Sequence, residues 1–171
     1  MRSPADIIAH LLVNLGLCTL EDEWPISVAI LPDTPDEAVC AYDTGGRMDG
    51  RILRTGEQIV HPGIQIRVRG KDYLASYAKI RAIALLLDLQ NDILVAFSDE
   101  EVYVIQNVSR TGDILPLGIE DIDGRRCHNF TMNAVLTLRE EEAITPPGAP
   151  SLTVDSSILT GDSNLVTVDH T

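Results

Sequence analysis

The triplet Asp-Thr-Gly at 43–45 is the stretch of this chain whose residue types could most directly do chemistry. In aspartic-type hydrolysis two carboxylates share one proton across a symmetric interface. The apolar run 38–42 precedes the triplet as that chemistry requires, but the sequence GRMD follows it at 46–49, where small and apolar residues are needed. We therefore expect a turn that leaves a strand, and keep an aspartic-type hydrolase acting through Asp43 as the alternative from a different class.

The other candidates for metal or nucleophile chemistry lack the spacing that such chemistry needs. Asp121 and Asp123 precede Gly124 as in a fragment of a calcium loop, but the flanking ligands are missing, so we expect a β-turn. The sequence contains no phosphate loop, dinucleotide fingerprint, nucleophile elbow or zinc-protease motif. The histidines and cysteines are widely scattered: His10, His61, His128, His170, Cys18, Cys40 and Cys127. We predict no catalytic, cofactor-binding or metal-binding residues, and cysteines that serve as small core residues.

The charge balance and the distribution of apolar residues argue against several classes of function. The 171 residues include 26 acidic and 13 basic ones, a net charge of −13, which disfavours binding of nucleic acid through its phosphates. The sequence has no run of about 18 apolar residues, so we expect no membrane span. The opening MRSPAD leads into a helix start without the apolar segment of a signal peptide, which predicts a protein kept in a reducing cytosol.

Capping residues and apolar periodicity predict the elements that must position these side chains. Ser3 caps a helix that ends at Gly16, and Asp72 caps a second helix over 73–89. Strands are expected at 26–31, 38–42, 65–69, 102–108 and 129–138. Residues 43–62 are a long glycine- and charge-rich excursion with room for a hairpin. We predict an α+β fold in which one mixed or antiparallel β-sheet of about five strands packs with two α-helices.

The composition changes after Arg139, which predicts an α+β core at 1–139 and an extended C-terminal arm at 140–171. The arm carries six acidic residues, three prolines and no lysine or arginine. Short apolar groups recur in it, at 152–154, 158–159 and 165–168. Two interpretations stay open: a disordered tail, or an extended arm that docks on a neighbouring subunit as an added strand.

The helix at 73–89 is apolar on more than one side. The stripe that we assign to the sheet consists of Tyr73, Tyr77, Ile80, Ala84 and Leu87. The opposite line begins with polar residues and continues with Ile83 and Leu86, which if exposed would each forgo about 1.5–3 kcal/mol of burial. Either another part of the chain covers Ile83 and Leu86, or a second subunit does. The second alternative makes these two residues part of a subunit interface.

Basic residues suggest a further candidate interface. Arg67 and Arg69 lie on one strand face, and Arg125 and Arg126 open the last strand. They are either solvated charges that balance an acidic chain, or partners for acidic edges such as 99–101 of a neighbouring subunit. Complementary charges of this kind fix the register of two subunits more than they add affinity.

Three segments, in this order, resemble the tail terminator (tail-completion, minor capsid) proteins of long-tailed bacteriophages. The first is AVCAYDTGG at 38–46, a strand and a turn before a long loop. The second is IQIRVRGKDYLASYAKIRAI at 64–83, a strand that ends in Arg-Gly before a helix that starts with an aromatic residue and alanines. The third is PLGIEDIDGRRCHNFTMNAVLTL at 116–138, a D-x-x-G-R turn and a strand of alternating polar and apolar residues. The resemblance covers roughly residues 5–139.

The resemblance implies a structural virion protein without catalytic residues. Proteins of this family form a hexameric ring that caps the growing tail tube, ends its polymerisation and joins the tail to the head connector. By analogy the sheet faces a lumen through which genomic DNA passes, and an acidic lumen would let the DNA slide without binding it.

The expected partners follow from the same resemblance. They are further copies of this chain, the tail tube protein and the head–tail connector or head-completion protein, with no membrane. The expected location is the tail or neck of the virion, assembled in the cytoplasm of the bacterial host. A head-completion or connector adaptor of the phage neck is the alternative within the structural proteins.

Overall fold

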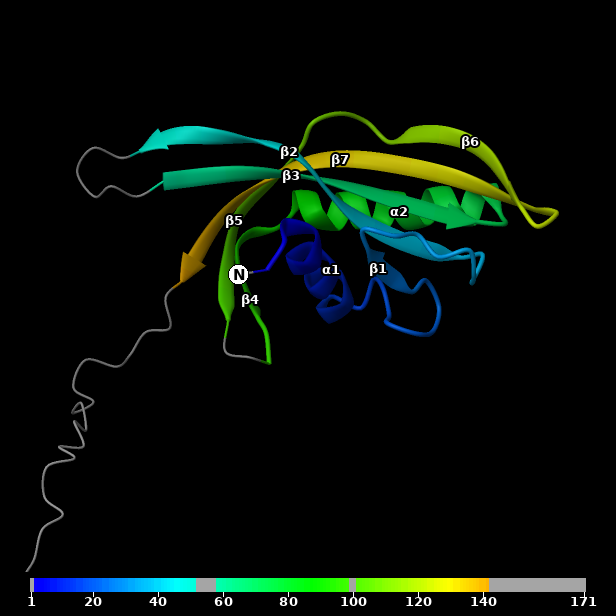
Figure 1. Cartoon of the computed structure of the whole chain (residues 1–171), viewed down its shortest axis with the longest axis horizontal. Coiled ribbons are helices and arrows are strands. Elements are labelled where there is room, and N and C mark those ends of the chain that lie inside the picture. Colours follow the sequence, from blue (N-terminus) through cyan, green and yellow to red (C-terminus); the bar gives the residue numbers. More distant parts are fainter. Residues whose placement is uncertain (1, 52–57, 99–100, 142–171) are drawn as a thin grey trace, which may run out of the picture.

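The computed structural model describes residues 2–51, 58–98 and 101–141, which form two helices and one seven-stranded sheet (Figure 1). In chain order the elements are α1 (Pro4–Asn14), β1 (Ile26–Val28), β2 (Ala38–Arg51), β3 (Gln58–Gly70), α2 (Tyr73–Asp88), β4 (Asn91–Ala96), β5 (Val102–Arg110), β6 (Leu115–Ile122) and β7 (Arg125–Glu141). The predicted α+β class with two helices is confirmed, and the sheet has seven strands where about five were predicted.

The sheet is mixed and curls around the helices. Its strand order is β1-β2-β3-β7-β5-β4, and β6 pairs with the first half of β7. The β1–β2 pair is parallel and the other described pairs are antiparallel. Figure 1 shows both helices on one side of the sheet, the side toward which β4 and β5 bend. The core between helices and sheet includes Ile7, Ile8, Leu12, Ile64, Ile66, Ile80, Leu87, Ile105, Phe130 and Met132.

Both predicted helix caps are present. Ser3 Oγ accepts a hydrogen bond from the backbone N–H of Asp6 at 3.2 Å, and Asp72 Oδ1 accepts one from Ala75 at 2.7 Å. These bonds satisfy N–H groups that the first turn of a helix leaves without an intrahelical partner. Gly16, just beyond α1, has a φ of 69°, a conformation that glycine adopts without strain and that stops the helix.

The last strand carries the predicted alternation of apolar and polar residues. Its buried, core-facing side chains are Phe130, Met132, Ala134 and Leu136. The neighbouring strand β3 continues this layer, because Ile64 pairs with Ala134 and Ile66 pairs with Met132. The two central strands therefore present one apolar surface to both helices.

Strands β2 and β3 extend well beyond the predicted 38–42 and 65–69. They form a long hairpin whose register shifts between Thr44 and Arg47, at the glycines 45–46. A Cβ atom on Gly63 would collide with the backbone of the opposite strand. The glycines that suggested an irregular excursion in the sequence thus permit a close approach of two strands.

Two strands, β4 and β6, lie where no strand was predicted. Strand β6 contains Pro116 and a glycine with positive φ, Gly118, and its register shifts between them. The predicted strand 26–31 is shorter than expected, because Ala29 has a φ of 65°, outside the β region. These features break the regular alternation by which a strand is found in a sequence.

The predicted boundary between core and arm falls inside the last strand. β7 continues to Glu141, two residues beyond 139, and the rest of the arm lies outside the described residues. In the described ranges, no helix has the length and apolar character needed to cross a membrane.

Candidate functional site

Asp43, the residue of the hydrolase alternative, makes a structural hydrogen bond. Its Oδ1 accepts the backbone N–H of Ala5 in the first turn of α1, at 2.8 Å. This bond ties β2 to the start of the helix and satisfies an N–H group that the helix cannot satisfy itself. The carboxylate that sequence analysis singled out thus has a role in the fold.

The Asp-x-Asp-Gly segment is a tight turn, as predicted. Asp123 and Gly124 connect β6 to β7, with φ values of 51° and 76°. Two consecutive residues with positive φ are typical of a type I′ hairpin turn. Asp121 Oδ1 accepts the N–H of Gly124 at 2.8 Å. Within residues 2–51, 58–98 and 101–141, no three His, Cys, Asp or Glu side chains lie together as a metal site requires.

Arg69, a predicted interface residue, is buried inside its own subunit. Only 1% of its surface is exposed. Its guanidinium donates to the carbonyls of Pro32 and Pro35, at 2.6 and 2.7 Å. The prediction of a subunit contact through Arg69 is therefore wrong, because the β1–β2 connection covers it completely.

Arg125 also has a partner within the chain, the largely buried carboxylate of Asp36. Arg125 Nη1 lies 2.6 Å from Asp36 Oδ1, and Lys71 Nζ lies 2.7 Å from Oδ2. The hydrogen bond from Lys71, together with the charge of Arg125, lowers the pKa of the Asp36 carboxyl, although burial opposes this shift. The two basic residues thus hold the β1–β2 connection against the sheet.

The remaining predicted basic residues differ in their surroundings. Arg67 donates to Glu120 at 2.8 Å and to Asn129 at 3.1 Å, which joins β3, β6 and β7 on the sheet face opposite the helices. Arg126, at the start of β7, is exposed. A subunit contact through Arg67, Arg125 or Arg126 stays a prediction.

The structure decides between the two alternatives for Ile83. Its side chain is fully buried in the core of the single chain. Another part of the chain therefore covers Ile83, and its predicted place in a subunit interface is wrong. Leu86, one turn along the same line, is half-buried, and its place in an interface stays a prediction.

The exposed apolar stripe of α2 runs along a different line from the predicted one. Leu74, Leu85 and Leu89 are exposed by 72, 54 and 77%. At 100° per residue these three, with Ala78 and Arg81 between them, lie on one face of the helix. The buried arc contains Ser76, Ile80, Ile83, Ala84 and Leu87. Tyr73 and Tyr77, assigned to the sheet, do pack near Phe130, the first edge-on and the second tilted, but both remain exposed.

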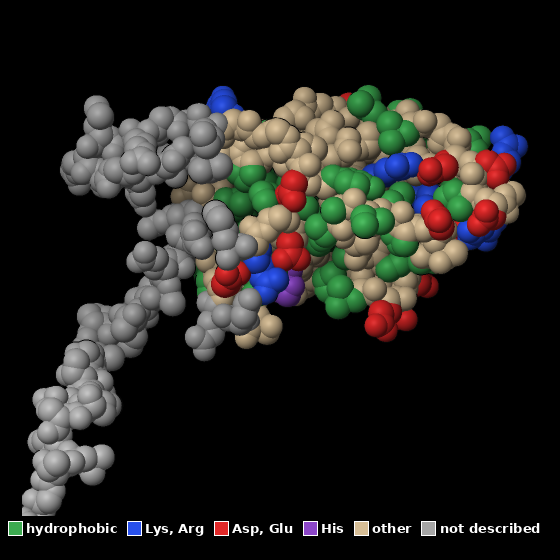
Figure 2. Space-filling view, viewed as in Figure 1, with side chains coloured by type: hydrophobic (Ala, Val, Ile, Leu, Met, Phe, Trp, Pro, Cys, Tyr) green, Lys and Arg blue, Asp and Glu red, His purple; other side chains and the backbone are tan. Residues whose placement is uncertain are grey.

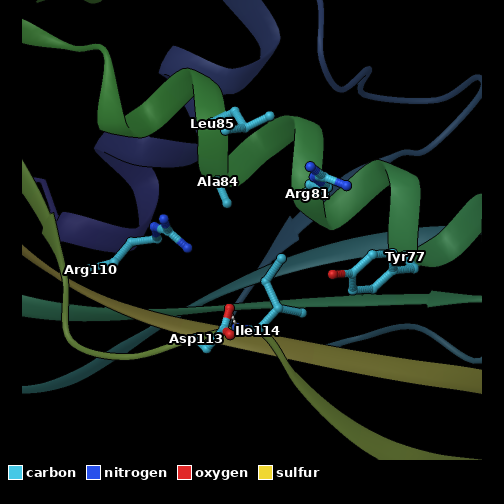
Figure 3. A pocket seen from close by; sticks show the side chains of 7 residues that line it. All are labelled: Tyr77, Arg81, Ala84, Leu85, Arg110, Asp113 and Ile114. Atoms are coloured by element: carbon cyan, nitrogen blue, oxygen red, sulfur yellow. Dashed lines mark hydrogen bonds between the residues drawn. The ribbon is translucent and has the colours of Figure 1, made fainter.

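A hollow lies between α2 and the connection from β5 to β6. We call it the α2 groove; its volume is about 320 Å³, and it is lined by Tyr77, Arg81, Ala84, Leu85, Arg110, Asp113 and Ile114. Figure 3 shows Ile114 extending toward α2 from the strand side, with Leu85 and Arg81 above it on the helix. Arg110 is held at its edge by an ion pair with Asp88, at 2.7 Å. The groove thus combines the apolar side chains of Ala84, Leu85 and Ile114 with two basic ones, Arg81 and Arg110, and one acidic one, Asp113.

The strand that follows the groove also exposes apolar side chains. Leu115, Leu117 and Ile119 of β6 are each about half exposed. β6 pairs with β7 alone among the described strands, so its other edge is open to a partner. Figure 2 shows apolar side chains at the surface over α2 and over β6, with charged ones gathered toward the β6–β7 turn. Exposed apolar surface of this extent is typical of a protein that associates.

A comparison with protein families matches residues 11–137 to the bacteriophage tail terminator proteins. The chain belongs to this family. The match extends from the last turn of α1 into β7 and so includes α2, the described strands β1 to β6 and most of β7. The protein is therefore a structural component of a phage tail, as the three resembling segments implied.

Other comparisons add little to the assignment as a tail terminator. No curated protein matches the chain significantly. A solved structure that carries only an identifier matches 70% of this chain and 82% of its own, with 13% identity and a TM-score of 0.41. The family match alone therefore carries the assignment.

The groove and the exposed leucines of this tail terminator were missed in the sequence, although a signal was present. Leu74, Leu85 and Leu89 follow helical spacing and could have been placed on one line with Arg81. The predicted buried stripe of Tyr73, Tyr77, Ile80, Ala84 and Leu87 puts the exposed apolar side at Ile83 and Leu86. The packing of the residues between α1 and β1 against α2 turns that arc toward Ile83: Lys79 donates to the carbonyl of Leu17 and lies over the Trp24 ring.

Proposed function

We propose that this chain forms a closed ring of six copies at the head-proximal end of the phage tail. The ring caps the tail tube, ends its polymerisation and joins the tail to the head connector. The observation that carries the proposal is the row of exposed leucines on α2 in a chain that belongs to the tail terminator family. Each leucine left in water forgoes about 1.5–3 kcal/mol, which a neighbouring copy would recover.

In a closed ring, one surface of each copy contacts a different surface of the next copy. We assign the outer face of α2, with Leu85 and Leu89, as one half of each contact. Strand β6, which has an open edge and exposes further apolar residues, follows the β5–β6 connection that lines the α2 groove. The half-buried Leu86 and the exposed Arg126 would lie at the borders of such contacts.

The net charge of −13 supports a lumen that DNA traverses without binding. Phosphates are held by basic side chains, and several of those in this chain are already paired: Arg67 with Glu120, Arg110 with Asp88, and Arg125 with Asp36. The proposed partners are the tail tube protein on one side of the ring and the connector or head-completion protein on the other.

Native mass spectrometry of the full chain and of matched variants tests the ring. The wild-type chain should give a complex whose mass is six times the 18.7 kDa of one chain. The double variant Leu85→Glu with Leu89→Glu should lose that species, because it places two charges in the contact, and should keep its circular dichroism spectrum. Ile30→Glu is the matched control, since Ile30 is exposed by 74% in the β1–β2 connection. A ring that persists in the double variant would exclude the α2 face as the contact.

A further inference from the structure

The C-terminal arm, which lies outside the described residues, contains a seven-residue sequence repeat. Residues 151–157, 158–164 and 165–171 read SLTVDSS, ILTGDSN and LVTVDHT. Each unit has a branched apolar residue at its second position, threonine at its third and aspartate at its fifth. These positions are Leu152, Leu159 and Val166; Thr153, Thr160 and Thr167; and Asp155, Asp162 and Asp169. Three copies of one apolar-and-acidic motif indicate a binding segment that is presented three times.

The α2 groove has the chemistry that complements this motif. Tyr77, Leu85 and Ile114 give it apolar contacts beside the charged Arg81, Arg110 and Asp113, and its volume of about 320 Å³ suits a few side chains and is too small for a folded element. Arg81 lies one helical turn before Leu85 and is exposed, and in the described part of the chain no ion pair occupies it. A peptide that brings aliphatic side chains and a carboxylate, and that has no lysine or arginine, matches both features.

The path of the chain favours the groove of a neighbouring copy. The groove lies beside Arg110, which pairs with Ala134, whereas the described chain ends at Glu141, about 23 Å further along β7. Figure 1 shows the end of β7 directed away from α2, past β5. To enter its own groove the arm would have to reverse this direction. The ten residues from 142 to 151 span up to about 35 Å, enough to reach an adjacent subunit.

We propose that the arm of one copy docks in the α2 groove of the next copy. The aliphatic residues of one repeat unit occupy the hollow beside Leu85, and the aspartate of that unit pairs with Arg81. Because the arm carries three units, the local concentration of binding units near the groove is high and the arm rebinds quickly after each release. This repeated binding helps to hold neighbouring copies together in the ring. This inference rests on the proposed ring, since it requires a neighbouring copy.

Photo-crosslinking in the full chain tests the docking. A photoreactive phenylalanine analogue is placed, in separate samples, at the sixth position of each unit: Ser156, Ser163 and His170. Chains labelled with ¹⁴N and ¹⁵N are mixed before irradiation, and mass spectrometry identifies the linked peptides. We expect links to residues 77–85 or 110–114 in which the two peptides carry different isotopes.

Variants separate specific docking from chance proximity. Arg81→Glu should lower the yield of these links about two- to fivefold, as for a partly exposed ion pair. Replacing the three repeat aspartates with lysine in the Arg81→Glu chain should restore it. Ile30→Glu should leave the yield unchanged.

Each result counts for or against a defined part of the proposal. Docking on a neighbour would be overturned by any of three results. These are links only between peptides of the same isotope, links to residues outside 77–85 and 110–114, or no link from any of the three positions. The native mass of the same samples separates the two proposals: a six-copy ring without these links refutes the arm alone. A chain that stays monomeric refutes both.

Discussion

At the scale of single residues, Asp36 has the most demanding environment in the described chain. Its carboxylate is largely buried and receives Arg125 and Lys71 on its two oxygens, at 2.6 and 2.7 Å. The backbone carbonyl of the same residue accepts the guanidinium of the buried Arg69 at 3.3 Å. One acidic residue thus organises three basic ones, two of which the sequence suggested for contacts between subunits.

The pH dependence of stability follows from the lowered pKa of Asp36. A carboxyl whose pKa is lower in the folded state stabilises the fold fully above its ordinary value, here 3.8, and stops doing so as the pH falls through the folded pKa. We expect Asp36→Asn to lower the melting temperature at pH 7 and to flatten its decline below about pH 4. Asp33→Asn, an exposed position in the same connection, should leave both unchanged. If the melting temperature of Asp36→Asn declined below about pH 4 as steeply as that of the wild type, the role assigned to this carboxylate would be contradicted.

The difference in burial between Ile83 and Leu85 can be tested by the stability of variants. Ile83→Ala should lower the free energy of unfolding by about 2–5 kcal/mol, because it leaves a cavity in the core. Leu85→Ala should change it by no more than about 0.5 kcal/mol, because that side chain faces solvent in the single chain. Chemical denaturation at a concentration that keeps the chain monomeric measures both. Equal losses in the two variants would show that α2 is rotated relative to the structure.

At the scale of elements, α2 shows how far a sequence determines a fold. The Asp72 cap and the helical spacing predict the helix nearly to the residue, since both are local. The rotation of the helix is decided by what surrounds it. The buried Ser76 illustrates this: its hydroxyl donates to the backbone of Asp72, so a polar residue can occupy a buried line that apolar periodicity alone assigns elsewhere.

The strands differ in the same way. β7 was found because its alternation is regular and its core-facing residues are large and apolar. β4 and β6 were missed, since Asp92 and Gly118 have positive φ and β6 exposes apolar residues to solvent. The candidate site was predictable in kind, as an exposed apolar side of one helix, but its residues depend on the packing of distant segments.

The β2–β3 hairpin yields a test at this scale. Gly63→Ala should destabilise the chain by about 1–3 kcal/mol, because the added methyl would collide with the backbone at Gly45 and the Thr44 side chain. Gly45→Ala is the matched control, since open space surrounds that position and its stability should change by no more than about 0.5 kcal/mol. Thermal unfolding of both variants distinguishes them. A neutral Gly63→Ala would mean that the two strands do not approach as closely as described.

At the scale of the whole molecule, an acidic chain exposes apolar side chains on one helix and one sheet edge. Its strong negative charge makes separate copies repel one another, so the proposed ring needs specific contacts such as those we assign to α2. Repulsion between acidic groups of neighbouring copies would oppose a ring. Part of this negative charge is neutralised within each copy, because Asp36, Glu120 and Asp88 form ion pairs with arginines. In the proposed ring, the apolar faces would form the contacts between copies and acidic surface would remain for the lumen.

Electron cryo-microscopy of the full chain bound to isolated tail-tube ends tests the ring most directly. The account predicts six copies around the tube axis, with Leu85 and Leu89 of every copy covered by a neighbour. A map in which the outer face of α2 meets only solvent, or in which the copies do not close a ring, would contradict it.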